Sequence, residues 1–501
     1  MNSQAKVPWP REMLWLGVVL CLGVSVRLIK IAQPFIDGWS WRQADVAMIA
    51  ENFYRHGFHL LHPQINWAGS APGYVGTEFQ LVPFIASLFY LCFGVHEWIG
   101  RAVSILFFTV SVPFFYLLVR KTANARRALL AVSIYSGTPL SIYASRSFMP
   151  DMASLSFSIA ALYLFAAWLE RGRAPWLFIA GCLATSLAIL VKLPAVMIGV
   201  PLLYMAWEKY GARWVLRREL WAFAILSLLW PLVWYVHAYL LSVRHFPYHF
   251  FGAGGLQIED LAWYLAILHW TVTESVTPLV FGALLIGILL PSRATFGWVF
   301  HWWLMGLLVF VVLAGKGNRH QWYQLPLVPV AAAFAGVSCD VALRQLRQRT
   351  GATITVVLAC GLFYAALASL SYRALTPLYD PQPQRLQAWQ LGRALHQLTP
   401  VNALVIVADD GDPTALYYSR RKGWHFLQDG MFKGYPVDSH QAIGYLEQWR
   451  QAGARYLGFT HYAFWWFEHY DGFQAYLDAR YRRVSETRDY LIFDLTLAHG
   501  E

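Results

Sequence analysis

The sequence predicts a polytopic α-helical membrane protein with a small α/β domain at its C-terminal end. Of its 501 residues, 57% are hydrophobic and 13% carry a charged side chain, whereas about 25% of residues are charged in an average soluble domain. Apolar runs of about 17 to 23 residues recur between short basic loops, and this is the length that a helix needs to cross a bilayer. The chain also contains 24 Trp and 27 Tyr residues, which favour the two membrane interfaces.

The net charge of +11 is typical of a membrane protein and does not indicate nucleic acid as a partner. Basic residues gather in cytoplasmic loops, where they also contact anionic membrane lipids. The five cysteines show no CxxC spacing, so the sequence contains neither a disulfide framework nor a zinc signature. The first apolar run lacks a small-residue cleavage pattern, and we expect it to be retained as the first span.

The predicted spans place the basic loops on one side of the membrane. The first span covers residues 14–31, and a large outer loop follows at 32–97. Inside this loop the apolar run 79–94 is interpreted as a surface or re-entrant helix, because the basic loop at 120–127 then lies inside with the others. About eleven transmembrane helices result, the other ten being 98–119, 127–145, 152–169, 175–191, 195–208, 220–241, 275–291, 296–314, 322–340 and 352–370.

The last part of the chain changes character. NALVIVADD is typical of a strand, QAIGYLEQWRQAGARYLGFT of a helix, a glycine turn and a strand, and RVSETRDYLIFDL of a closing strand. The sequence therefore predicts a transmembrane module at 1–370 and an α/β domain at 371–501. We expect a multi-pass protein of the inner (plasma) membrane, with this domain on the periplasmic or extracellular side.

Polar residues at the outer ends of the spans form the predicted active site. Placing ionisable groups at membrane depth costs free energy, and such groups usually have a functional role. A carboxylate can take the proton of an acceptor hydroxyl, and Lys or Arg can hold a phosphate as it leaves. Residues of both kinds lie on the outer side: Asp37, Arg42, Asp45, Glu78, Arg146, Asp151, Lys192, Lys316, Arg319, His320 and Tyr323. Together they describe transfer of a group from a phosphate-bearing lipid.

Each of these residues also has a structural interpretation. Arg146 and Asp151 would form an ion pair, Lys192 would be an interfacial anchor, and His320 would be a packing histidine. The acids at 409–412 resemble a metal site, although a plain polar turn explains them as well. We predict an active site because these residues cluster on one side of the membrane.

The chain resembles a family of lipid-linked-sugar glycosyltransferases with the GT-C fold, which includes lipid A aminoarabinose transferases and protein O-mannosyltransferases. The matching stretches are WRQADVAMIAENFY, FGVHEWIGRAVSILF, IYASRSFMPDMASL, LAILVKLPAV and RHQWYQLPLVP. The C-terminal domain also resembles that of the aminoarabinose transferases. The resemblance implies an inverting transfer at the outer face, from a sugar on a polyprenyl phosphate to a hydroxyl or phosphate of a lipid, polysaccharide or protein.

The resemblance also implies roles for single residues. The catalytic base would be Asp45, which belongs to the WRQAD helix, or Asp37, which lies earlier in the loop. Lys192 resembles the lysine of an LTKGP-like motif near the donor phosphate. Relatives carry Lys-Pro-Pro-Leu after an acid, whereas Glu78 is followed by Phe-Gln-Leu, so Arg42 or Lys192 would replace the missing lysine. The donor-phosphate residues would be Arg42, Lys192, Arg146 and Arg319, and the substrate pocket would contain Glu78, Asp151, His320 and Tyr323.

Two points stay open at the level of sequence. No cofactor is certain, although Glu78 and His320 leave a divalent metal possible. A lipid-linked saccharide transporter or flippase is the alternative function, and a scaffold that displays the C-terminal domain is a third. A transporter would show inverted repeats and broken helices in matching halves, which the sequence lacks, and a scaffold would not need acids and bases gathered outside.

Overall fold

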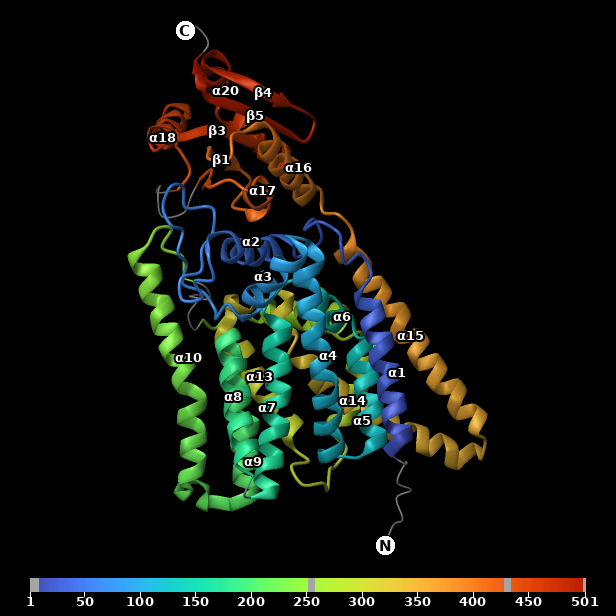
Figure 1. Cartoon of the computed structure of the whole chain (residues 1–501). Helices are drawn as coiled ribbons and strands as arrows, with labels where there is room; N and C mark the ends of the chain where they lie inside the picture. Colours follow the sequence, from blue (N-terminus) through green and yellow to red (C-terminus); the bar gives the residue numbers. More distant parts are fainter. Residues whose placement is uncertain (1–8, 173, 251–256, 428–433, 499–501) are drawn as a thin grey trace. The chain divides into compact units, whose positions relative to one another are not determined.

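The computed structural model describes residues 9–172, 174–250, 257–427 and 434–498 (Figure 1). The chain divides into two compact units. Unit 1 contains residues 1–31, 101–235 and 252–377, and unit 2 contains residues 32–100, 236–251 and 378–501. The long helices α4 (Glu97–Thr122), α10 (Arg218–Arg244) and α15 (Thr353–Tyr379) cross from one unit into the other.

All the secondary-structure elements described in unit 1 are helices. Besides most of α4, α10 and α15, it contains α1 (Trp9–Arg27), α5 (Ala125–Gly137), α6 (Pro139–Arg146), α7 (Asp151–Arg171), α8 (Pro175–Val191), η1 (Leu193–Ile198), α9 (Gly199–Tyr210), η2 (Gly211–Leu216), α11 (Leu261–Trp270), η3 (Thr271–Ser275), α12 (Pro278–Ile288), α13 (Val299–Ala314), η4 (Gly315–Asn318), η5 (Gln321–Gln324) and α14 (Leu327–Thr350).

Long apolar helices confirm that the chain is a multi-pass membrane protein. Among the described residues, six helices are long and apolar enough to cross a membrane, or seven if the bent pair α11–α12 counts as one span. Several predicted spans are shorter or interrupted: the run 127–145 breaks before Pro139 into α5 and α6, and the run 195–208 begins as the 3₁₀ helix η1. The number eleven therefore stays a prediction.

The packing of unit 1 depends on small residues and on one buried arginine. A Cβ atom on Gly336 of α14 would lie 2.9 Å from the backbone of α5, and one on Gly287 of α12 would lie 2.3 Å from the Phe334 carbonyl of α14. These glycines let three helices approach closely.

Arg27 of α1 is fully buried. Its guanidinium donates to the Gly23 carbonyl (2.8 Å) and to Ser141 Oγ (2.9 Å), and it lies 3.4 Å from the centre of the Phe108 ring. Its charge thus ties α1 to α4 and α6.

Unit 2 combines two helices of the first loop with a five-stranded sheet. The loop helices are α2 (Ser40–His56) and α3 (Leu81–Phe93). With 13 residues, α3 is about 20 Å long, which is short for a hydrocarbon core of about 30 Å. The C-terminal part contains α16 (Pro383–Leu398), β1 (Leu404–Ala408), α17 (Pro413–Ser419), β2 (Gly423–His425), α18 (Ser439–Gln451), β3 (Ala454–Thr460), η6 (His461–Ala463), α19 (Trp465–His469), α20 (Asp471–Arg480), β4 (Tyr481–Glu486) and β5 (Tyr490–Ala498).

The sheet has the order β2-β1-β3-β5-β4. Strand β1 runs parallel to β2 and β3, whereas β5 runs antiparallel to β3 and β4. An aromatic core packs against the sheet, with the Phe426 ring 5.1 Å from Trp449, 4.5 Å from Trp466 and 5.7 Å from Phe473 between ring centres. The expected small α/β arrangement near the C-terminus is thus confirmed. The division of the chain at residue 370 stays a prediction.

The first loop is hydrogen-bonded to the edge of this sheet. The Gly69 N–H donates to the Gly423 carbonyl (2.7 Å), and the Gly423 N–H donates to the Asn66 carbonyl (2.9 Å). On the other side of the loop, the Asn52 amide of α2 donates to the Gln64 carbonyl at 2.8 Å. The edge strand β2, the loop segment 64–69 and α2 therefore form one connected structure. Unpaired strand edges are otherwise liable to associate with other chains.

We predict that Gly69→Ala detaches this loop segment from β2. Gly69 has a φ of +59°, and a Cβ atom there would lie 1.9 Å from the Trp424 ring. Hydrogen exchange of residues 57–76 in the full-length protein should therefore become faster. Gly411→Ala is the matched control, because Gly411 also has a positive φ (+78°) but nothing lies within 4 Å of its Cβ position. Equal exchange of this segment in the two variants would contradict the docked loop.

Candidate active site

In unit 1, Asp151 and Lys192 lie where one helix begins and another ends. Asp151 is in the first turn of α7, where the helix dipole favours a negative charge. Lys192 follows the last residue of α8 with an extended backbone (φ −157°), and Pro194 two residues later cannot continue the helix. Ser154 Oγ donates to the Ala188 carbonyl at 2.8 Å. This bond between α7 and α8 keeps the two charged residues at the same end of the helix pair.

The two charges form a buried ion pair. The Lys192 ammonium donates to Asp151 Oδ1 and lies 4.6 Å from the centre of the Tyr323 ring of η5. The side chains are only 4% and 10% exposed for Asp151 and Lys192. Asp151 Oδ2 is buried and has no hydrogen-bond partner among the described residues. A further polar group that enters this position would therefore find an acceptor oxygen.

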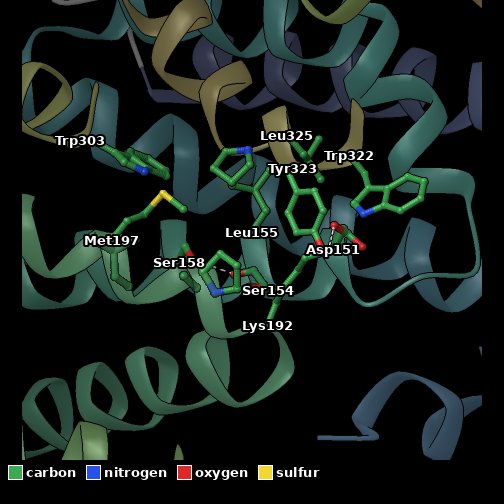
Figure 2. A pocket seen from close by; sticks show the side chains of 14 residues that line it. Asp151, Ser154, Leu155, Ser158, Lys192, Met197, Trp303, Trp322, Tyr323 and Leu325 are labelled. Carbon is green, nitrogen blue, oxygen red and sulfur yellow. Dashed lines mark hydrogen bonds and ion pairs between the residues drawn. The ribbon is translucent and has the colours of Figure 1, made fainter. Parts of the chain in front are cut away.

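This ion pair borders a pocket with an empty volume of about 410 Å³. In Figure 2, Lys192, Asp151 and Tyr323 lie together at one side of the pocket, whereas Met197 and Trp303 lie at the other. The lining residues are Asp151, Ser154, Leu155, Ser158, Lys192, Pro194, Ala195, Met197, Ile198, Trp303, Trp322, Tyr323, Leu325 and Pro326. The pocket thus offers a cation, a phenol and two serine hydroxyls against an apolar wall.

Four other predicted residues of unit 1 lie outside this lining, namely Arg146, Lys316, Arg319 and His320. Arg146 is fully buried at the end of α6, where its guanidinium donates to the Lys30 carbonyl at 2.9 Å. Arg319 is exposed, with its Nε 3.3 Å from His320 Nε2. The His320 ring stacks on Trp322, with ring centres 4.3 Å apart. The structure therefore gathers Asp151, Lys192 and Tyr323 around one pocket.

In unit 2, Arg42 of α2 joins two carboxylates. It donates to Asp45 Oδ2 at 2.8 Å and to Glu78 Oε1. The other oxygen of Glu78 accepts from Thr77 Oγ1 at 2.6 Å. Arg42 and Glu78 side chains are each 5% exposed, whereas the Asp45 side chain is 15% exposed. The role of Arg42 in holding a donor phosphate stays a prediction, and its guanidinium also contacts two carboxylates.

The contacts of the Asp37 carboxylate include two neutral donors of α2. Its Oδ1 accepts from Gln43 Nε2 at 2.8 Å and from Ser40 Oγ at 3.1 Å, and the residue is fully buried. Neither Gln43 nor Ser40 was predicted as a site residue. Their positions six and three residues after Asp37 follow from the start of α2 at Ser40, and a helix boundary is among the weaker predictions from sequence.

A second feature missed at the sequence level is the pair formed by Asp409 and His425. Asp409 follows β1 and His425 ends β2, with His425 Nδ1 2.8 Å from Asp409 Oδ1 and both side chains buried. Asp412 instead caps α17 and pairs with Arg385.

Across the residues that the structure describes, no three His, Cys, Asp or Glu side chains are placed to hold a metal.

We predict that Arg42→Gln destabilises the protein by about 3–5 kcal/mol, because it removes the cation that the buried Glu78 carboxylate shares with the partly buried Asp45 carboxylate. Arg55→Gln is the matched control on α2. Arg55 also pairs with an acid, Glu51 at 2.6 Å, but its side chain is 41% exposed, and exposed pairs contribute about 0–1 kcal/mol. Thermal unfolding of the two full-length variants measures the difference. Equal shifts in the midpoint would show that the Arg42 bridge is not a buried ion pair.

We predict that the Asp409–His425 pair loses stabilising free energy as the pH rises from about 6 to 8. Burial raises the pKa of Asp409 to about 6. Burial lowers the pKa of His425, but the carboxylates of Asp409, Asp412 and Asp45 together raise it by more, with Asp409 the largest of the three, and the net shift is upward. A histidine whose pKa is raised on folding stabilises fully below about 6.5, its unfolded value, and the stabilisation is lost as the pH rises through the folded value.

Hydrogen exchange of β1 and β2 in the full-length protein, corrected for intrinsic rates, tests this. His425→Gln should lower protection more at pH 6 than at pH 8. His440→Gln, at an exposed position of α18, should change protection at neither pH. A loss of protection in His425→Gln that is the same at both pH values would contradict a charged pair.

Comparison with known proteins agrees with the helical architecture. A family model described as dolichyl-phosphate-mannose-protein mannosyltransferase matches residues 80–237, about a third of the chain. An uncharacterized protein of Aquifex aeolicus (strain VF5) is 23% identical over 320 residues, which are 60% of this chain and 70% of that protein.

Two solved structures are similar over nearly the whole chain. ArnT from Cupriavidus metallidurans bound to undecaprenyl phosphate aligns with a TM-score of 0.65 and 13% identity, over 96% of this chain and 97% of that chain. The archaeal oligosaccharyltransferase AglB from Archaeoglobus fulgidus, in complex with an inhibitory peptide and a dolichol-phosphate, aligns with a TM-score of 0.57 and 13% identity, over 96% of this chain and 74% of that chain. The chain therefore has the GT-C glycosyltransferase fold.

Proposed function

We propose that this protein is an integral-membrane glycosyltransferase that moves a sugar from a polyprenyl-phosphate donor to an acceptor hydroxyl or phosphate. The observation that carries the proposal is the buried pocket with Lys192, Asp151 and Tyr323, in a chain whose fold is that of polyprenyl-phosphate-binding proteins. ArnT is solved with undecaprenyl phosphate and AglB with dolichol-phosphate.

The Lys192 ammonium of unit 1 would hold the donor phosphate. When the bond between the sugar and the phosphate breaks, negative charge grows on the phosphate oxygen. The Lys192 ammonium has three N–H donors, of which Asp151 uses one, so further donors can stabilise this charge. Asp151 and Tyr323 would orient the ammonium. Arg146 and Arg319 would add positive charge, and His320 would complete the substrate pocket.

The acceptor would be activated by a carboxylate of unit 2. A base takes the proton from the acceptor hydroxyl, while the acceptor oxygen attacks the sugar carbon from the face opposite the phosphate, so that the configuration is inverted. Asp45 and Asp37 are the candidates. Asp45 has the more accessible carboxylate, at 15% side-chain exposure against a fully buried Asp37, and a base must reach the proton that it removes. Arg42 and Glu78 would then fix Asp45 in place.

We place the protein in the inner (plasma) membrane, with these groups on the periplasmic or extracellular side. The excess of Arg and Lys in the opposite loops supports this orientation. The acceptor would be a lipid, a glycan or a protein. Transport of a lipid-linked saccharide is the other candidate, but the GT-C fold supports transfer better, since the relatives of known structure named above include an oligosaccharyltransferase.

We predict that Asp45→Asn lowers turnover about 10²–10⁴-fold, the usual contribution of a general base, while polyprenyl-phosphate binding is kept. Asp37→Asn shows this loss instead if Asp37 is the base. Asp410→Asn is the matched control, because Asp410 is exposed and asparagine tolerates its positive φ of 57°.

Mass spectrometry of lipids and surface glycans from cells that produce each variant provides the measurement. Glycan product that is lost in one of the two variants and kept in Asp410→Asn supports the transferase. Unchanged glycan product in both variants, together with altered translocation of the lipid-linked saccharide, would favour the flippase.

A further inference from the structure

A cluster of three arginines surrounds one carboxylate in unit 1. Asp340 of α14 is fully buried. It accepts from Arg127 Nε at 3.0 Å and from both Arg344 Nε at 3.0 Å and Arg344 Nη2 at 2.8 Å. Arg126 Nη1 lies 3.7 Å from the same carboxylate. We name these four residues the Asp340 cluster.

The Asp340 cluster has an uncompensated positive charge. Three guanidinium groups share one carboxylate, which leaves a net charge of +2. At the C-terminal end of α4, by contrast, Lys121 forms an ion pair with a single acid, Glu170. Burying an unpaired carboxylate at membrane depth costs free energy. One arginine would be enough to neutralise the Asp340 carboxylate. The two extra arginines therefore point to an anion from outside the chain.

A pocket lies beside the cluster, with an empty volume of about 410 Å³. Arg127 lines it, and so does His301, whose Nε2 is 3.1 Å from the Ile288 carbonyl and whose Nδ1 is buried without a hydrogen-bond partner among the described residues. The remaining lining is small or apolar apart from Thr122 and Ser292, and consists of Val119, Thr122, Ala123, Gly287, Leu290, Pro291, Ser292, Gly297, Phe300, Ala333, Phe334 and Val337. The site thus has a cationic rim and an apolar interior.

The position of the site suits a lipid of the membrane leaflet opposite the proposed active site. Asp340 lies 13 residues after Leu327, the first residue of α14, and thus about 20 Å along the helix from the segment that carries Tyr323. The adjoining helix α12 exposes Leu285 and Ile286 at 51% and 59%, and Leu289, the residue that follows α12, is 82% exposed. Acyl chains would cover this surface. Polybasic groups at this level attract anionic lipid.

We propose that the Asp340 cluster and its pocket bind an anionic phospholipid. The phosphate of the head group is held by Arg126, Arg127 and Arg344, and the glycerol and first acyl carbons cover the open, largely apolar mouth of the pocket. This site is separate from the Lys192 pocket, and it does not depend on which reaction the protein catalyses.

The test measures lipid binding to the full-length, delipidated protein in a zwitterionic detergent. Dioleoylphosphatidylglycerol should raise the unfolding midpoint in a saturable way, and dioleoylphosphatidylcholine at the same mole fraction should not. Native mass spectrometry should show an at least tenfold weaker affinity for phosphatidylglycerol in the double variant Arg126→Gln/Arg344→Gln. These side chains are 53% and 45% exposed, and Arg127 still pairs with Asp340, so the variant should fold.

The control is Arg347→Gln/Arg349→Gln, which removes the same charge from exposed positions of the same helix and should change the affinity less than twofold. An equal loss of phosphatidylglycerol affinity in the control would show that general surface charge causes the effect, and it would overturn the proposal. So would an equal response to phosphatidylcholine. Inorganic phosphate that reproduces the shift in midpoint would identify a free anion as the ligand and overturn the assignment to a lipid.

Discussion

The buried ion pair between Lys192 and Asp151 is the interaction on which the proposed chemistry depends. Neither charge can stay inside an apolar helix bundle alone, because an unpaired buried charge costs several kcal/mol. The pair satisfies both charges where α7 begins and α8 ends, and it keeps an ammonium group at the wall of a pocket that is otherwise largely apolar. A phosphate that enters can share this ammonium without the protein having to bury a new lysine.

The same constraint organises the other polar groups of the molecule. In unit 2, Arg42 serves Asp45 and Glu78 together, and the Asp409–His425 pair lies between β1 and β2. Where an acid gathers more cations than it needs, as Asp340 does, the surplus marks a place for a ligand.

Much of the architecture could be predicted from the sequence, because apolar runs of membrane-spanning length and a switch to alternating strands are strong signals. The gathering of Lys192, Asp151 and Tyr323 was also expected, since each lies at an end of a predicted span. The breaks within the runs 127–145 and 195–208 were not expected, because composition alone does not show where a helix stops.

Contacts between distant residues were the hardest to predict. Arg42 meets Glu78 across 36 positions of the chain, and His425 meets Asp409 across 16, so no local spacing indicates either pair. The docking of residues 66–69 on β2 uses backbone groups, which every residue carries, and leaves no pattern of side chains to find. Whether Asp37 or Asp45 is the base is equally beyond local sequence.

The most direct test of the account is the affinity of the full-length protein for a polyprenyl phosphate after Lys192→Gln. If the Lys192 ammonium holds the phosphate, the dissociation constant should rise about tenfold or more, since a hydrogen bond to a charged group contributes about 1.5–3 kcal/mol. Lys209→Gln is the control, because Lys209 is an exposed lysine in the last turn of α9 and does not line the pocket. Equal affinities for the wild type and Lys192→Gln would contradict the account.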